Sequence, residues 1–135
     1  MRILTVDDSR VIIPYFKHIF KDLENVIWVG HAFNIAEAEE LMRSEQPDVI
    51  FLDICLKTGN GFTFLKSIKR KYPSVNVFML SNNRNAVYTQ KSQEHGALFL
   101  IDKTNEFHLI PFFLEALKIA QNSGQRIEEF SPLIF

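Results

Sequence analysis

Short hydrophobic runs alternate along this chain with longer segments in which hydrophobic residues recur at helical spacing. Two of the runs, at 48–52 and 75–80, are hydrophobic on both faces, as buried strands of a parallel sheet are. This alternation is typical of strand and helix units that repeat on a parallel sheet. It predicts five strands, over residues 2–6, 26–32, 48–52, 75–80 and 97–101.

Helices are predicted in the gaps between the strands. Four of them follow from helical spacing and from the proline or glycine residues that end them. They lie at about 34–44, 62–72, 85–94 and 110–121. The 85–94 helix has few large hydrophobic residues, so we expect it to be held less firmly than the others. The 62–72 helix should turn four cations toward solvent, namely Lys66, Lys69, Arg70 and Lys71.

The first helix follows Ser9. Pro14 is expected past the first turn, where it should bend the helix or loosen one hydrogen bond. The residues expected to face the core are Ile12, Tyr15, Phe16, Ile19 and Phe20. Trp28, on the second strand, is also expected in the core.

Length and charge narrow the function classes. A chain of 135 residues, 47% of them hydrophobic, is suited to one domain with one core. Fifteen basic and sixteen acidic residues give a net charge of −1, which disfavours direct binding to nucleic acid or to an anionic membrane. Cys55 is the single cysteine, and the N-terminus has no signal pattern, so a cytoplasmic protein is expected.

Polar residues end four of the five predicted strands. In an open parallel sheet the ligand crevice lies at the carboxyl ends of the strands, where Asp7-Asp8, Asp53, Ser81 and Asp102-Lys103 fall. Three carboxylates at one edge repel one another unless a cation lies among them, and oxygen ligands favour Mg²⁺. These residues therefore predict a Mg²⁺ site.

The same residues suit phosphoryl transfer. Asp53 would attack phosphorus, Lys103 would neutralise the charge that develops on the transferred oxygens, and Ser81 would donate a hydrogen bond to one of them. Each residue also has a simpler interpretation. An Asp-Asp pair often caps a helix, a strand-end lysine is often a surface charge, and Ser81 with Asn82 and Asn83 is a turn signal.

In combination these elements resemble the receiver domain of two-component response regulators, over residues 1–121. The matching segments are ILTVDDS at 3–9, PDVIFLDI at 47–54, GNG at 59–61, MLSN at 79–82 and GA at 96–97 followed by Lys103. The resemblance implies an α/β fold: a five-stranded, doubly wound parallel sheet of flavodoxin-like order 2-1-3-4-5, flanked by five helices.

The resemblance also implies roles for individual residues. Asp53 would be the phosphoacceptor, and Ser81 and Lys103 would bind the phosphoryl group. Asp8 would ligate Mg²⁺ directly, Asp7 largely through water, and the backbone carbonyl of Cys55 would be a further ligand. Four positions depart from the family pattern: Leu100 replaces a common aromatic, Thr104 and Lys57 replace common prolines, and Asn82 replaces a small residue.

The expected function is phosphorelay signalling. A sensor histidine kinase or phosphotransfer protein would supply the phosphoryl group, and a downstream protein would respond to it. No enzymatic activity is expected beyond self-phosphorylation and slow self-dephosphorylation. The tail 122–135 is too short for an output domain. The main alternative is a phosphorylation-independent dimerisation module, and a small metal-dependent phosphatase is a weaker one.

The output surface is expected on the fourth helix, fifth strand and fifth helix, through which a homodimer or a partner would bind. The segment containing Leu109, Phe112 and Phe113 is hydrophobic on nearly every side, so partner contact and complete burial both remain open. Cys55 is interpreted as a packing or side-wall residue. The four histidines, which lack metal-ligand spacing, are interpreted as surface or hydrogen-bonded residues.

Overall fold

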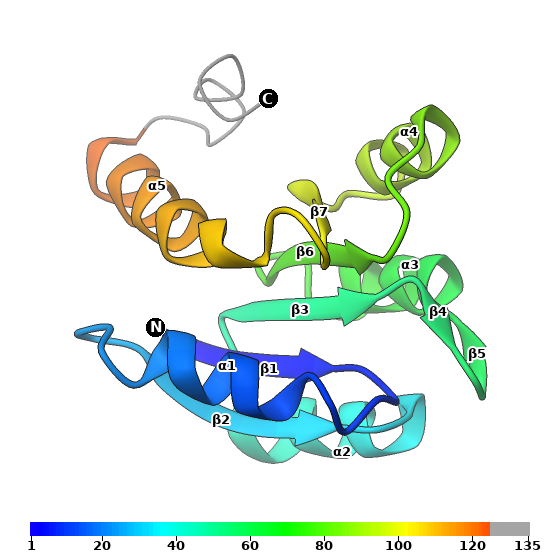
Figure 1. The fold of residues 1–135 in the computed structure, drawn as a ribbon, viewed down its shortest axis with the longest axis horizontal. Coiled ribbons are helices and arrows are strands. Elements are labelled where there is room, and N and C mark those ends of the chain that lie inside the picture. The colour runs from blue at the N-terminus through cyan, green and yellow to red at the C-terminus, as the bar shows by residue number, and fades with distance from the viewer. Residues whose placement is uncertain (125–135) are drawn as a thin grey trace.

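A computed structural model describes residues 1–124 of the chain. In this part, five parallel strands form one sheet in the order β2-β1-β3-β6-β7, with helices on both faces (Figure 1). The strands are β1 (Arg2–Val6), β2 (Ile27–Ala32), β3 (Val49–Asp53), β6 (Asn76–Ser81) and β7 (Phe99–Asp102), with a small antiparallel hairpin of β4 (Cys55–Leu56) and β5 (Gly59–Asn60). The helices are α1 (Ile13–Phe20), α2 (Ile35–Glu45), α3 (Gly61–Lys71), α4 (Ala86–Glu94), the 3₁₀ helix η1 (Phe107–Leu109) and α5 (Ile110–Ser123). The predicted fold and strand order are confirmed.

Asparagine side chains begin three of the helices. Asn34, Asn60 and Asn85 each accept a hydrogen bond from a backbone N–H in the first turn of α2, α3 and α4. These bonds satisfy donors that a helix start otherwise leaves without a partner. At the other end of α2, Gln46 adopts a left-handed conformation before Pro47, which stops the helix as predicted.

Helix α1 differs from the prediction. It begins at Ile13, so Pro14 lies in the first turn, where its missing N–H costs nothing, and the predicted bend is wrong. Phe16 and Phe20 are buried as expected, but the Tyr15 side chain is 58% exposed. The helical spacing identified the right face but not how much of it the sheet covers.

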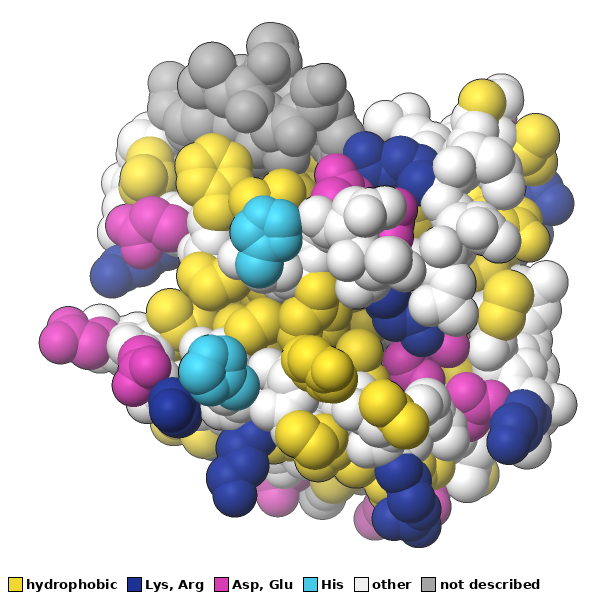
Figure 2. All heavy atoms as spheres, in the orientation of Figure 1, with side chains coloured by type: hydrophobic (Ala, Val, Ile, Leu, Met, Phe, Trp, Pro, Cys, Tyr) yellow, Lys and Arg dark blue, Asp and Glu magenta, His cyan; other side chains and the backbone are white. Residues whose placement is uncertain are grey.

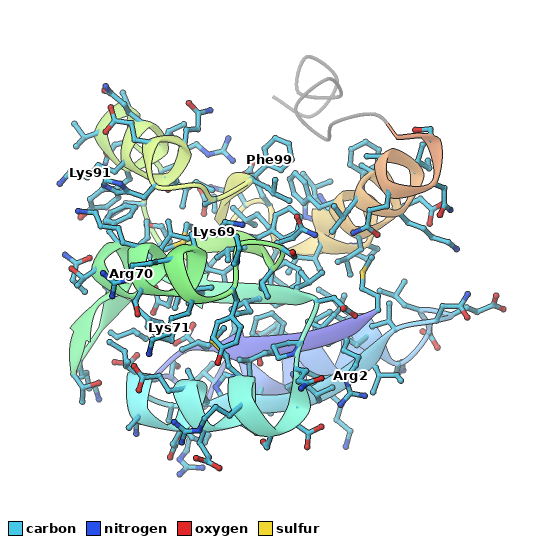
Figure 3. The ribbon with its side chains drawn as sticks, turned by 180° about the vertical axis from the view of Figure 1, so that it is seen from behind. Arg2, Lys69, Arg70, Lys71, Lys91 and Phe99 are labelled. Carbon is cyan, nitrogen blue, oxygen red and sulfur yellow. The ribbon has the colours of Figure 1, made fainter. Side chains whose placement is uncertain are left out.

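Two hydrophobic clusters fill the two faces of the sheet. Helices α2 and α3 pack mainly aliphatic residues on one face, whereas α1 and α5 pack an aromatic-rich cluster on the other. In that cluster the rings of Phe51 and Phe78 stack 5.2 Å apart, and Phe99, labelled in Figure 3, continues the stack 6.1 Å further. Trp28 lies at the edge of the cluster and is partly buried, so its predicted core position is only partly right.

The end of α3 shows a second correction. Figure 3 labels Lys69, Arg70 and Lys71 on this helix. Arg70 and Lys71 are exposed as predicted, but Lys69 folds back and donates hydrogen bonds to the carbonyls of Pro73 (3.0 Å) and Val75 (2.7 Å). Burial lowers the pKa of Lys69. Lys69 therefore caps the turn after the helix.

Helix α4 is held loosely, as predicted. Of its residues, all of which the structure describes, Ser92 alone is buried. Nowhere in residues 1–124 is a helix long and hydrophobic enough to cross a membrane. Most of the predicted tail lies outside the described residues, and α5 extends two residues past its predicted end.

Candidate functional site

Three carboxylates meet at the carboxyl end of the sheet. Asp7 and Asp8 follow β1, and Asp53 ends the neighbouring strand β3. One oxygen from each of these three residues lies within 4.8 Å of those of the other two. Asp7 and Asp53 are buried, and all three offer only oxygen donors. This donor set fits a Mg²⁺ ion, so the predicted residues are brought together in a suitable place.

Lys103 completes the cluster from the loop after β7. Its Nζ donates a hydrogen bond to Asp7 Oδ2 at 2.8 Å and lies 3.3 Å from Asp53 Oδ2. Its backbone N–H donates to the carbonyl of Ser81 at 2.8 Å, which ties the loop to the end of β6. One cation therefore faces two buried carboxylates.

Burial and neighbouring charges shift the pKa values of Asp53 and Lys103. Burial raises the pKa of Asp53 to about 6, opposed by the charge of Lys103 and reinforced by that of Asp7. Burial alone would lower the pKa of Lys103, but its hydrogen bond to Asp7 and the charge of Asp53 raise it above the usual value. Three carboxylates and one ammonium leave a net negative charge, which favours a further cation.

The β4–β5 hairpin forms one wall of the site. Asp8 Oδ2 accepts a hydrogen bond from the backbone N–H of Lys57 at 2.8 Å, and Asp53 Oδ1 accepts one from Cys55 N–H at 3.2 Å. Cys55 is exposed, so of its two interpretations the side-wall one agrees with the structure and packing does not. The ligand role of its carbonyl stays a prediction.

Gly61 holds this wall against the strand. Its N–H donates to the carbonyl of Ile54 at 2.8 Å. A Cβ at position 61 would lie 2.4 Å from the carbonyl oxygen of Asp53, closer than atoms can approach. In the sequence, GNG is a segment of the family pattern, and its spacing does not reveal this contact with β3.

Ser81 ends β6 beside the cluster, but its hydroxyl is engaged elsewhere. Its Oγ donates to the carbonyl of Asn83 at 2.7 Å and accepts from the N–H of Asn83 at 3.1 Å. This is the turn geometry that was the simpler interpretation of Ser81. Its hydroxyl must leave Asn83 before it can donate to a phosphoryl oxygen.

Arg84, in the same loop, reaches across to the segment around Lys103. Its Nη2 donates to the carbonyl of Leu100 at 2.6 Å and pairs with the carboxylate of Glu106. Glu106 also accepts from the N–H of Asp102 at 2.9 Å. This link was not predicted, because no local pattern connects positions 84 and 106 in the sequence.

A second group that the sequence analysis missed lies behind Asp7. His31 on β2 contacts Thr5 Oγ1 through Nδ1 (2.7 Å) and the backbone carbonyl of Asp7 through Nε2 (2.9 Å). Trp28 Nε1 donates to the same Thr5 hydroxyl at 3.0 Å. His31 is thus a hydrogen-bonded histidine, as predicted, but the partners were not foreseen.

Comparison with known proteins adds a family likeness. Residues 3–111 match the sequence profile of the response regulator receiver domain. Protein-glutamate methylesterase/protein-glutamine glutaminase of Thermotoga maritima is 31% identical over 99% of this chain and 41% of its own length. The enzyme of the same name from Pyrococcus abyssi is 35% identical over 76% of this chain and 28% of its own. The chain therefore spans less than half of these relatives.

Two solved structures of receiver domains resemble the fold of this chain. The response regulator domain of Thermotoga maritima CheB is 32% identical, with a TM-score of 0.76 over 90% of this chain and 96% of that one. The isolated REC domain of RcsB from Salmonella enterica serovar Typhimurium, in the presence of the phosphomimetic BeF₃⁻, has a TM-score of 0.82 over 93% of this chain and 91% of that one. At 22% identity it supports the fold alone.

Proposed function

This chain belongs to the response regulator receiver domain family, and we propose that it is a phosphorylation-controlled switch whose phosphoacceptor is Asp53. The observation that carries the proposal is the placement of Asp53. Its buried carboxylate ends a central strand beside Asp7 and Asp8, and Lys103 Nζ lies 3.3 Å away from it. The switch would occupy residues 1–121 and would act in the cytoplasm.

Asp7, Asp8 and Asp53 would hold Mg²⁺, together with the backbone carbonyl of Cys55. Bound there, Mg²⁺ would offset the repulsion among the carboxylates and neutralise charge on the transferred oxygens. The fit rests on three oxygen donors that already lie within 4.8 Å of one another.

In the chemical step, a carboxylate oxygen of Asp53 attacks phosphorus and forms an O–P bond. The bond between phosphorus and the donor breaks, and its electron pair leaves with the donor. Lys103, already 3.3 Å from Asp53, would pair with a phosphoryl oxygen. Ser81 would turn from Asn83 to donate to another, because its hydroxyl is the donor that ends the adjacent strand β6.

The phosphodonor would be a protein, such as a sensor histidine kinase or phosphotransfer protein. A mostly hydrophobic groove of about 330 Å³ lies between α1 and the segment after β7, and Lys103 is part of its wall. Hydrophobic side chains gather over α1 on this face (Figure 2). A protein seated in the groove would lie beside the residue that pairs with Asp53.

The signal would leave through the loop 82–85. If the Ser81 hydroxyl leaves Asn83, the loop is no longer tied at its start, and the contacts of Arg84 with Leu100 and Glu106 must adjust. These contacts lie between α4 and the start of α5. The output surface would therefore be the face of α4, β7 and α5, used for a downstream protein or a homodimer.

Labelling with acetyl phosphate tests this function. With Mg²⁺, intact mass should show one added phosphoryl group, which Asp53→Asn abolishes because a carboxamide cannot form the acyl phosphate. Asp8→Ala should lose Mg²⁺ binding by calorimetry, whereas Asp22→Asn, at an exposed loop position, should not. An adduct that persists in Asp53→Asn would rule out the assignment. Unlabelled protein that still associates would favour the phosphorylation-independent module.

A further inference from the structure

We propose that His31 is a positioning residue that fixes the peptide bond between Asp7 and Asp8. Through that peptide it sets the direction of both carboxylates. The inference rests on the proposed function, because it concerns the same Mg²⁺ site. The observation behind it is the 2.9 Å contact between His31 Nε2 and the Asp7 carbonyl, which belongs to that peptide.

The direction of the hydrogen bonds follows from their chemistry. A carbonyl oxygen only accepts, so Nε2 of His31 carries the hydrogen, and Nδ1 of the neutral ring is then an acceptor. The Thr5 hydroxyl accepts from the indole N–H of Trp28 at 3.0 Å and donates to Nδ1 at 2.7 Å, a much shorter contact than the 3.5 Å to the Gly30 carbonyl. These three hydrogen bonds form a relay in which each donor points the same way, from Trp28 through Thr5 and His31 to Asp7.

The relay acts where the sheet ladder ends. The last paired residues of β1 and β2 are Val6 and Ala32, and Asp7 N–H still donates to the Ala32 carbonyl at 3.0 Å. The Asp7 carbonyl lies one step beyond this pairing. The side chain of His31 supplies the donor for that carbonyl.

The peptide that His31 holds joins two carboxylates with different tasks. The Asp7 carboxylate accepts hydrogen bonds from Lys103 Nζ and from the backbone N–H of Ser9. The Asp8 carboxylate accepts one from the backbone N–H of Lys57 in the hairpin. Rotation of this peptide would move the two side chains apart. Groups that orient metal ligands from behind commonly change metal affinity by about 10–100-fold when removed.

The packing around His31 permits a clean variant. Its ring makes an edge contact with Phe33 at 4.7 Å and a tilted one with Phe16 at 6.4 Å. Phenylalanine at position 31 would keep these contacts and lose the donor. Glutamine would keep an N–H near the place of Nε2.

Mg²⁺ titration by calorimetry tests the role, on protein shown to be folded. His31→Phe should weaken Mg²⁺ binding by about tenfold, whereas His31→Gln should stay within about threefold of the parent. His95→Phe, at a partly buried histidine at the end of α4, should bind Mg²⁺ as the parent does. Nitrogen NMR of the parent should show His31 as the Nε2–H tautomer.

The outcomes separate the two proposals. If the parent is labelled on Asp53 but His31→Phe binds Mg²⁺ like the parent, the positioning role is wrong and the proposed function stands. An Nδ1–H tautomer also overturns the positioning role. If the parent is not labelled, the proposed function fails. The Mg²⁺ affinities of the parent and of His31→Phe still decide whether His31 is a positioning residue. Should His31→Phe not fold, Thr5→Val replaces it: weaker binding of Mg²⁺ supports the relay, and unchanged binding refutes it.

Discussion

Gly61 lies so close to Asp53 that a side chain at position 61 would have to displace the end of strand β3. A Cβ there would be 2.4 Å from the Asp53 carbonyl oxygen and 2.8 Å from Ile54 Cα, both rigid backbone atoms. We therefore expect Gly61→Ala to lower the free energy of unfolding by about 2–3 kcal/mol, measured in urea. At Gly59 the new Cβ would meet only the end of the flexible Ile35 side chain. Gly59→Ala should therefore lower the free energy of unfolding by clearly less than Gly61→Ala does. Equal losses would show that the contact is relieved easily.

The raised pKa of Asp53 predicts how stability depends on pH without Mg²⁺. Between the usual value of 3.8 and about 6, the folded protein holds a proton that the unfolded chain has released. The free energy of unfolding should therefore fall as pH rises through this window, by at most about 3 kcal/mol. In Asp53→Asn this contribution disappears. Urea unfolding of both proteins at pH 4 and pH 7 measures the difference, and parallel pH profiles would contradict the shift.

The pairing of Arg84 with Glu106 predicts a loop held in its resting position. Arg84→Gln should loosen the loop and move the amide NMR signals of residues 82–85 part of the way toward those of the BeF₃⁻-treated parent. Glu106→Gln is a milder variant, because its amide oxygen can still accept from Asp102 N–H while the charge is lost. Signals that do not move in either variant would show that Arg84 does not restrain the loop.

Two neighbouring phenylalanines on α5 provide a matched test of the output face. Phe112 is 49% exposed, and Val87 of α4 is 59% exposed, whereas Phe113 is fully buried. Phe112→Asp should change stability by roughly 0.5 kcal/mol, preserve labelling and weaken association in sedimentation with BeF₃⁻. Phe113→Asp should unfold the protein, since it buries a charge in the aromatic cluster. Association that survives Phe112→Asp would place the output surface elsewhere.

The sequence predicted the elements with strong local signals. The five strands, the carboxylates at their ends and the helix stops at Gln46 and Tyr72 depend on nearby residues, so they could be located from spacing alone. The hairpin of β4 and β5 could not, because strands of two residues have no periodicity.

Contacts between neighbouring strands could not be predicted from the sequence either. That His31 lies beside Thr5 depends on the register of two strands separated by a helix. The direction of the Ser81 hydroxyl depends on the shape of the loop to Asn83, whose carbonyl accepts its hydrogen bond. The strand-end pattern located residues that the fold brings together, whereas the three-dimensional register determines how they are held.

The position of Trp28 gives the protein a natural optical reporter. It is the single tryptophan of the chain, and its ring packs against Phe16 and Phe20 on the aromatic side of the sheet. Its fluorescence therefore senses one of the two hydrophobic clusters, while far-ultraviolet circular dichroism senses helices on both faces. Coincident unfolding curves from the two signals would show that the clusters melt as one cooperative unit, and separated curves would show that one face can open while the other stays folded.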